Sequence, residues 1–230
     1  MKNKKEKLIV ALDFPDFASA CKIVEEIGDE IIFYKIGLEM LASGDYFKMV
    51  DYLKNKGKKV FADLKLYDIP ATIGRTVKNL TQYEIDLLTI HSANSEIMRE
   101  AAQNKAKMKI LAVSVLTCLE KSDLNEMGFS HELSLEDLVL KKSELSIKSG
   151  IDGVVASVLE TEFLRKKLGN DFLIVTPGIR IGGGSHQDQK RVSDVKSALI
   201  AGADYLVVGR PITQSQQPRE TARSFIDMIL

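Results

Sequence analysis

Short runs of apolar, largely β-branched residues recur along the whole chain, and longer amphipathic stretches separate them. Continuous apolar character, rather than alternation, favours strands that are buried on both faces, as in a parallel sheet. The predicted strands are Leu8–Leu12, Ile31–Ile36, Lys59–Ala62, Leu87–Ile90, Lys109–Val115, Gly153–Ala156, Phe172–Val175 and Tyr205–Val208.

The stretches between these runs carry apolar residues at the spacing of one helix face. Three such stripes are Ala20, Ile23, Val24 and Ile27; Leu135, Leu138, Val139 and Leu145; and Ala222, Phe225, Ile226 and Ile229. Strands that alternate with helices in this number predict an α/β fold, the (β/α)8 TIM barrel, as a single domain over residues 1–230. The chain lacks the early GxGxxG turn that would support a doubly wound dinucleotide-binding fold.

Composition narrows the class of protein without identifying it. The 32 basic and 32 acidic residues balance, so no overall field favours nucleic acid or a membrane surface. Cys21 and Cys118 are not in a zinc-binding or CxxC spacing, which favours a reducing compartment. The first apolar run ends at Asp13, too early for a signal peptide, and no run approaches the ~20 residues of a membrane span. We expect a cytoplasmic protein.

Charged residues follow several of the apolar runs. Asp13 ends the first, Lys35 the second, and Asp63 and Lys65 come directly after the third. Because the active site of a barrel lies at the carboxyl ends of its strands, these side chains should converge there. Packing alone does not explain hydrophobic strands that end in charge at several separate places.

The segment Phe61–Pro70 carries the densest pattern. Asp63 and Lys65 are two residues apart, so on an extended strand they point the same way, and Asp68 can fold back towards them after a turn. A lysine between carboxylates stays charged and suits proton delivery to carbon beside developing negative charge. Asp63 and Lys65 alone could equally form a surface ion-pair network.

The segment FADLKLYDIPAT, Phe61 to Thr72, resembles the signature of the orotidine 5′-phosphate decarboxylase family. The resemblance continues in order along essentially the whole chain. It includes Ala11–Asp13, Tyr34–Gly37, Leu116–Thr117, Thr176–Arg180, the glutamine-containing loop Gln187–Arg191, and Val208–Thr213.

The resemblance implies a barrel enzyme that converts orotidine monophosphate to uridine monophosphate and carbon dioxide without metal or cofactor. Lys65 would protonate pyrimidine C6, with Asp63 and Lys35 holding it in place and Lys35 and Asp13 near the ribose hydroxyls. Asp68, with Ile69 and Thr72, would enter the site from the partner subunit of a homodimer. These roles are what the resemblance implies.

The resemblance also implies the remaining substrate contacts. Thr117 and Ser114 would contact the pyrimidine end. Arg210, Gln189 and the backbone of Gly209 would grip the 5′-phosphate, for which the planar fork of arginine is well suited. Arg180 would lie on the loop that closes over the phosphate, and Pro177 in the same segment would also bind the substrate. Taken alone, each of the two arginines could be a solvated loop residue.

Other candidate groups have plainer interpretations. His91 ends the fourth run, but a lone histidine there is more often a hydrogen-bonded structural group, and we give neither it nor His131 and His186 a catalytic role. Cys118 is interpreted as structural. The segments His91–Asn94 and Gln214–Gln217 depart from the family pattern, which affects the expected loop geometry and not the proposed chemistry.

Two rival functions remain. The first is a decarboxylase or aldolase that acts on a sugar phosphate, such as a magnesium-dependent 3-keto-gulonate 6-phosphate decarboxylase. That family shares the Asp-x-Lys-x-x-Asp segment but carries an acidic residue at the end of its second strand. Here that position is Lys35, which would repel a cation. A non-catalytic barrel that binds a phosphometabolite would not need every matched catalytic position filled, as it is here.

Overall fold

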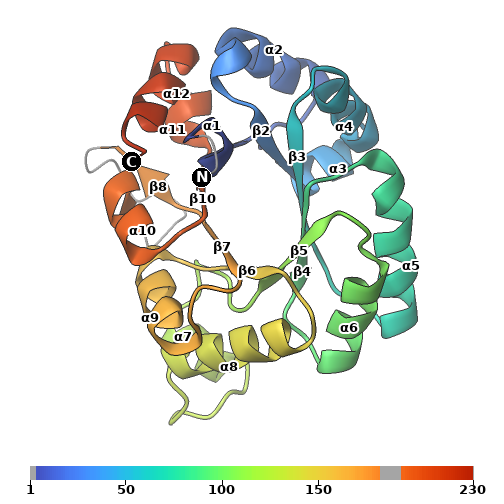
Figure 1. The fold of residues 1–230 in the computed structure, drawn as a ribbon, viewed down its shortest axis with the longest axis vertical. Coiled ribbons are helices and arrows are strands. Elements are labelled where there is room, and N and C mark those ends of the chain that lie inside the picture. Colours follow the sequence, from blue (N-terminus) through green and yellow to red (C-terminus); the bar gives the residue numbers. More distant parts are fainter. Residues whose placement is uncertain (1–3, 182–192, 230) are drawn as a thin grey trace.

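The computed structural model describes residues 4–181 and 193–229, and the predicted barrel is confirmed there (Figure 1). The barrel strands are β1 (Leu8–Ala11), β2 (Phe33–Gly37), β3 (Lys59–Leu66), β4 (Leu87–His91), β5 (Lys109–Val113), β6 (Gly153–Val155), β7 (Leu173–Thr176) and β10 (Tyr205–Val208). They close in the order β1-β10-β7-β6-β5-β4-β3-β2, with every neighbouring pair parallel. A separate two-stranded sheet pairs β8 (Ile179–Arg180) with β9 (Ser193–Asp194).

Helices surround the strands, as Figure 1 shows. They are α1 (Lys4–Lys7), α2 (Phe17–Ile27), α3 (Leu38–Ser43), α4 (Tyr46–Asn55), α5 (Pro70–Leu80), α6 (Ser95–Asn104), α7 (Lys121–Glu126), α8 (Leu135–Lys148), α9 (Val158–Leu168), α10 (Val195–Ala201), α11 (Arg210–Thr213) and α12 (Pro218–Asp227), with 3-10 turns η1 (Gly28–Glu30) and η2 (Thr81–Tyr83). Polar side chains cap the N-termini of several of these helices. Asn94, in the segment that departs from the family pattern, caps α6 by accepting a hydrogen bond from the Ile97 amide.

The predicted stripe of α2 is buried as expected, whereas that of α8 is partly wrong. Leu145 is exposed, and the packed face of α8 instead carries Ser143 and Ser146. The Ser146 hydroxyl donates to the Lys142 carbonyl and to the Ser92 hydroxyl after β4. Small hydroxyl residues thus meet the barrel where the apolar pattern predicted leucine. At the C-terminus Ile229 is buried, as its stripe predicted, but it lies beyond the end of α12.

The largest error in a strand boundary concerns β3, which was predicted to end at Ala62 and continues to Leu66. The apolar pattern stops at Asp63, because Asp63 and Lys65 line the cavity, whereas Leu64 between them still belongs to the core. The other barrel strands agree with prediction to within about two residues, which is the usual uncertainty of such boundaries.

Two apolar layers support the strands. The interior of the barrel is filled by Ile9, Ala11, Phe33, Phe61, Leu87, Leu111, Val175 and Val207. A larger cluster lies between the strands and the helices, and in β1 it takes the alternate residues Leu8 and Val10. Because both faces of each strand are packed, the residues at the strand ends stand on a rigid base.

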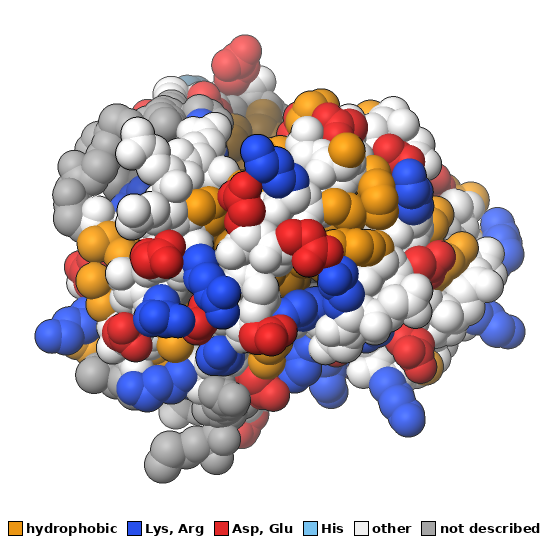
Figure 2. Space-filling model, turned by 90° about the horizontal axis from the view of Figure 1, so that it is seen from above, with side chains coloured by type: hydrophobic (Ala, Val, Ile, Leu, Met, Phe, Trp, Pro, Cys, Tyr) orange, Lys and Arg blue, Asp and Glu red, His pale blue; other side chains and the backbone are white. Residues whose placement is uncertain are grey.

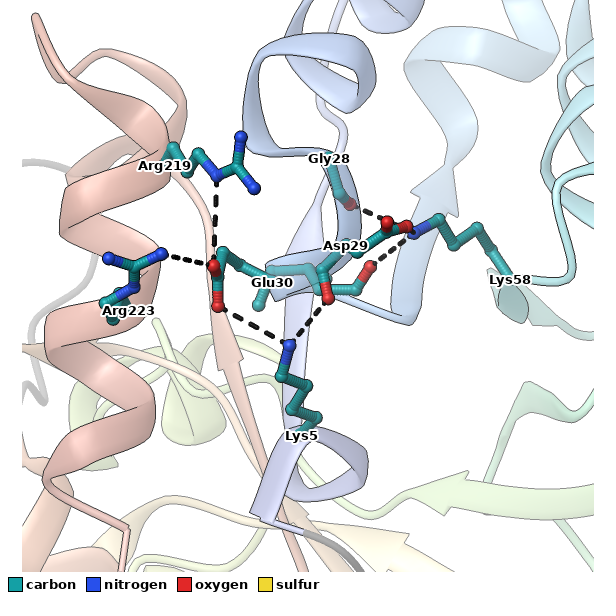
Figure 3. A network of polar contacts seen from close by, with 8 residues as sticks. Lys5, Gly28, Asp29, Glu30, Lys58, Arg219 and Arg223 are labelled. Atoms are coloured by element: carbon teal, nitrogen blue, oxygen red, sulfur yellow. Dashed lines mark hydrogen bonds and ion pairs between the residues drawn. The ribbon is translucent and has the colours of Figure 1, made fainter.

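Glu30 joins the two ends of the chain (Figure 3). Its carboxylate accepts a hydrogen bond from Arg223 of α12 at 2.6 Å and lies 3.8 Å from Arg219 of the same helix and 3.5 Å from Lys5 of α1. Beside it, Lys58 donates to the backbone carbonyl of Gly28 at 3.0 Å. These contacts fasten the last helix to the first βα unit, where the barrel closes.

The outer surface is mixed in charge. Figure 2 shows acidic and basic side chains interspersed on the face that it draws, in keeping with the balanced composition. Within residues 4–181 and 193–229, none of the helices combines the length and the apolar character that crossing a membrane requires.

Candidate active site

A cavity of about 550 Å³ lies at the carboxyl ends of the barrel strands. Its apolar floor is formed by Phe61, Val113, Val155, Val175 and Val207. Its polar wall includes nine of the predicted site residues: Asp13, Lys35, Asp63, Lys65, Thr117, Pro177, Arg180, Gly209 and Arg210. These residues come from the ends of six strands and the loops that follow, so the fold alone brings them together.

Four charged side chains form a series of alternating sign along one side of the cavity. The Lys35 ammonium donates to Asp13 Oδ1 at 2.8 Å and lies 3.5 Å from Asp63 Oδ2. The Lys65 ammonium donates to the other oxygen of Asp63, Oδ1, at 2.8 Å. We call Asp13, Lys35, Asp63 and Lys65 the charged series. It presents the Lys65 ammonium to the cavity while each inner charge has an opposite neighbour on both sides.

The inner members of the series keep their charges despite burial. Burial lowers the pKa of Lys35, but the carboxylates of Asp63 and Asp13 outweigh it and raise that pKa overall. Burial likewise raises the pKa of Asp63, but Lys35, Lys65 and the hydrogen bond from Thr89 lower it below the usual aspartate value. At neutral pH, Lys35 is therefore a cation and Asp63 an anion.

The strand that carries Asp63 and Lys65 is not regular, contrary to the expectation of an extended segment. Between Ala62 and Leu66 the register of β3 against β4 shifts, and Lys65 takes a left-handed backbone conformation with φ 47°. The two side chains still meet, but the bulge and not the two-residue period aims them. Thr89 of β4 forms hydrogen bonds with this bulge. It lies inside an apolar run and was not predicted to be a site residue.

A group suited to phosphate lines the same cavity. Arg210 is the first residue of α11, and with Arg180 it also lines an adjoining hollow of about 800 Å³ between α11 and α12. A Cβ at Gly209 would make only ordinary contacts, 3.5 Å from Ala11 Cβ and 3.9 Å from Asp13 Oδ2, so this backbone lies beside the charged series. Gln189, Gly182–Gly184 and His186 lie outside the described residues.

Three predicted residues lie outside the cavity of their own chain. Asp68 and Ile69 are exposed after β3, and Thr72 is half-buried in the first turn of α5. None of the three lines the cavity. Asp68 Oδ1 accepts a hydrogen bond from the Ile69 amide at 2.6 Å. Within one chain, the expected approach of Asp68 to Lys65 is therefore not seen.

Ser114 is also absent from the cavity lining, although it is buried directly after β5. Its hydroxyl is one of the buried side-chain oxygens that have no hydrogen-bond partner among the described residues. A buried hydroxyl without a partner costs about 1–3 kcal/mol, so this group is poised to accept one.

Some residues of the cavity wall were not predicted from the sequence. Gly37, Glu39 and Gln214 line the cavity, and none was singled out by a motif role. Gly37 could have been found from the sequence, because it lies in the family segment Tyr34–Gly37. A Cβ there would lie 3.6 Å from Lys35 Nζ. His91 stays outside the cavity with its ring edge against Tyr67. Burial, followed by the charges of Lys142 and Lys65, lowers the pKa of His91.

Known proteins of one family match this chain over nearly its whole length. The sequence profile described as "Orotidine 5′-phosphate decarboxylase / HUMPS family" matches residues 6–225. An orotidine 5′-phosphate decarboxylase of Methylococcus capsulatus is 47% identical over 219 residues, which cover 95% of this chain and 89% of that protein. A protein of the same description from Stenotrophomonas maltophilia is 45% identical over 220 residues, covering 95% and 90%.

The structural likeness extends over the same range. The crystal structure of orotidine 5′-phosphate decarboxylase from Lactobacillus acidophilus matches with a TM-score of 0.85 at 31% identity, over 96% of this chain and 97% of that one. A crystal structure described as an uncharacterized conserved protein from Geobacillus kaustophilus matches with a TM-score of 0.82 at 29% identity, over 95% and 97%.

We expect Asp63→Asn to destabilise the fold by about 3 kcal/mol at neutral pH, because it leaves the buried Lys35 ammonium without its inner partner. The folded pKa of Asp63 lies below the unfolded value of ~3.9, so its contribution is complete above that value. It is lost as pH falls through the folded pKa. In urea denaturation, the difference between wild type and variant should therefore shrink in strong acid.

Asp51→Asn is the matched control, because Asp51 is exposed on α4 and the substitution removes the same charge. It should change the free energy of unfolding by less than about 0.5 kcal/mol throughout. A difference for Asp63→Asn that is equally small, or that stays constant from neutral to strongly acid pH, would contradict the role of the charged series.

Proposed function

The chain belongs to the orotidine 5′-phosphate decarboxylase family and catalyses the decarboxylation of orotidine 5′-monophosphate to uridine monophosphate in pyrimidine biosynthesis, and we propose that Lys65 protonates pyrimidine C6 as carbon dioxide leaves. The observation that carries this mechanism is the charged series, which places an ammonium at the cavity wall and fixes it by Asp63.

The chemistry requires that two electrons be accommodated at carbon. When the bond between C6 and the carboxylate breaks, its electron pair stays on C6, and the Lys65 ammonium supplies the proton that forms the C6–H bond. Lys65 is left neutral and takes up a proton from water afterwards. A cation already aimed at C6 stabilises the developing negative charge before the proton moves, and it needs little reorganisation.

Binding of the remote phosphate supports the reaction at C6. We assign the 5′-phosphate to Arg210, the backbone of Gly209 and Gln189, with Arg180 over it. Arg180, Gly209 and Arg210 line the cavity together, and the last two βα loops form phosphate sites in many barrels. Contacts to a non-reacting group raise the rate of the chemical step when they stabilise the closed state, since closure excludes water around the charged series.

The remaining contacts orient the nucleoside. We assign the ribose hydroxyls to Asp13 and Lys35, which are bonded to each other at 2.8 Å at the cavity wall. Thr117 and Ser114 are assigned to the pyrimidine end, and Pro177, which lines the cavity, is assigned to substrate binding. The buried, unpartnered hydroxyl of Ser114 supports its assignment, because a small rearrangement would let it bond a polar edge of the base.

We further propose a homodimer in which Asp68, Ile69 and Thr72 complete the partner's site. All three lie outside the cavity of their own chain, and Ile69 is 64% exposed beside Tyr67 at 70%. Large exposed apolar side chains next to an active site are typical of a contact surface. Asp68 would then stand beside the substrate carboxylate and the Lys65 ammonium of the other subunit.

The charged series also favours a reaction without a metal ion. The Lys35 ammonium lies between Asp13 and Asp63, the carboxylates that a divalent cation would need as ligands. Free thiols at Cys21 and Cys118 support the proposal of a reducing, cytoplasmic location.

Lys65→Ala is expected to abolish turnover and to leave binding of uridine monophosphate within about tenfold of wild type, since it removes the proton donor but none of the phosphate contacts. Orotidine monophosphate consumption, followed by ultraviolet absorbance, and calorimetry with the product test this. Wild-type turnover should be unaffected by a strong metal chelator. Loss of product binding as severe as the loss of activity would contradict the proton-donor role.

Arg210→Ala should weaken the binding of uridine monophosphate by about 100-fold, on the order of one lost charge-assisted contact, and leave uridine binding almost unchanged. The ratio of the two dissociation constants is the measured quantity. Arg219→Ala is the matched control, because Arg219 is exposed on α12 and pairs with Glu30. An unchanged preference for the phosphorylated ligand in Arg210→Ala would refute the assignment.

If each active site contains residues of both subunits, two inactive variants should restore activity when they are mixed. A mixed dimer of Lys65→Ala and Asp68→Asn subunits has one site with both changes and one with neither, so mixing should restore activity through the intact site. Each variant alone, refolded in the same way, is the control. A mixture that exchanges subunits but stays inactive would show that Asp68 does not act across the interface.

A further inference from the structure

We propose that Thr89, in the middle of β4, is a positioning residue for Lys65: its hydroxyl closes the bulge of β3 and sets both the backbone of the proton donor and the carboxylate that holds it. This inference rests on the proposed role of Lys65. It adds a residue that lines no part of the cavity and lies in an otherwise apolar run.

The strand register places Thr89 opposite the bulge. Ala62 of β3 pairs with Leu88 of β4, and the next pair is Leu66 with Ile90. Four steps along β3 thus face two steps along β4, so the segment from Asp63 to Lys65 has only Thr89 opposite it. A bulge removes ladder hydrogen bonds, and the freed backbone groups need other partners.

The Thr89 hydroxyl is one of these partners, and it also donates a hydrogen bond of its own. It accepts the backbone N–H of Lys65 at 2.9 Å and donates to Asp63 Oδ1 at 2.9 Å. That oxygen also accepts the Lys65 ammonium at 2.8 Å. One hydroxyl group therefore joins the two ends of the same lysine, its amide directly and its ammonium through Asp63.

The backbone conformation makes this contact consequential. Lys65 has φ 47°, a region that costs a side-chain-bearing residue of order 1–3 kcal/mol and persists only where the surroundings enforce it. Thr89 is fully buried, so water cannot replace its hydroxyl. A residue that lacks the hydroxyl would leave the Lys65 amide unsatisfied and release the lysine towards a regular strand conformation, which aims its ammonium elsewhere.

The same loss would change the electrostatics of the site. The hydrogen bond from Thr89 is one of the interactions that lower the pKa of Asp63, together with the facing cations Lys35 and Lys65. Without it that pKa rises, and Asp63 is protonated, with loss of its hold on Lys65, at a higher pH than in the wild type.

The test compares Thr89→Val, which keeps the shape and removes both hydrogen bonds, with Thr89→Ser, which restores the hydroxyl. We expect Thr89→Val to lower kcat on the order of 30-fold, as for two lost hydrogen bonds, one of them to a charged group. Binding of uridine monophosphate should stay within about threefold, and the acid limb of the pH profile of kcat should move to higher pH. Thr89→Ser should recover most of kcat and the wild-type pH profile.

Thr161→Val is the matched control. Thr161 is a fully buried threonine on α9 whose hydroxyl donates to the Ser157 carbonyl at 2.8 Å and lies 3.2 Å from the Thr176 hydroxyl. Neither threonine lines the cavity. This variant should lower the melting temperature and leave kcat and its pH profile unchanged. Equal losses of kcat in Thr89→Val and Thr161→Val would assign Thr89 a structural role only.

Two further results distinguish a failure of the proposed function from a failure of the positioning role of Thr89. If the wild type does not consume orotidine monophosphate, the proposed function fails, whatever the variants do. If the wild type is active and Thr89→Val matches it in kcat and pH profile, the positioning role is overturned. Should Thr89→Val not fold, Thr89→Ala removes the same hydrogen bonds in a smaller side chain and is judged by the same two quantities.

Discussion

Asp63 accepts hydrogen bonds from Lys65 and Thr89 on one carboxylate oxygen and faces the Lys35 ammonium with the other. Removing this one carboxylate would leave a buried cation beside a second cation, at a large cost in free energy. The position of Lys65, the charge state of Lys35 and the path of β3 all depend on it. The alternating charges therefore stabilise the site, and the hydrogen bonds fix the orientation of each charged side chain.

The barrel makes such an arrangement possible because it brings distant parts of the chain to one rim. Asp13 follows β1, Lys35 lies in β2, and Arg210 follows β10 near the C-terminus, yet all three line the same cavity. The interior layer beneath them is apolar and closely packed. An apolar layer of this kind lowers the local dielectric constant, which strengthens the interactions between the charges above it.

In the proposed mechanism the cavity separates the tasks of binding and chemistry. Arg180 of β8 and Arg210 after β10 would bind the phosphate, while the charged series would hold the ribose and act at the pyrimidine. In the proposed dimer the partner's Asp68 would join the second group and not the first. A division of this kind lets contacts to phosphate be tightened without disturbing the electrostatics at C6, which are set by burial and by the bulge.

Much of this followed from the sequence, because the signals were local. Tyr205–Val208 was predicted with the observed bounds, since a run of apolar residues between polar turns is a one-dimensional pattern. The residues that end the strands were likewise identified from order along the chain. Tertiary structure decided what depends on neighbours far away in sequence: which face of α8 is buried, and that Asp68 lies outside its own cavity. It also decided that Thr89, a residue with no motif around it, meets the bulge of β3, because strand register arises only when β3 and β4 pair.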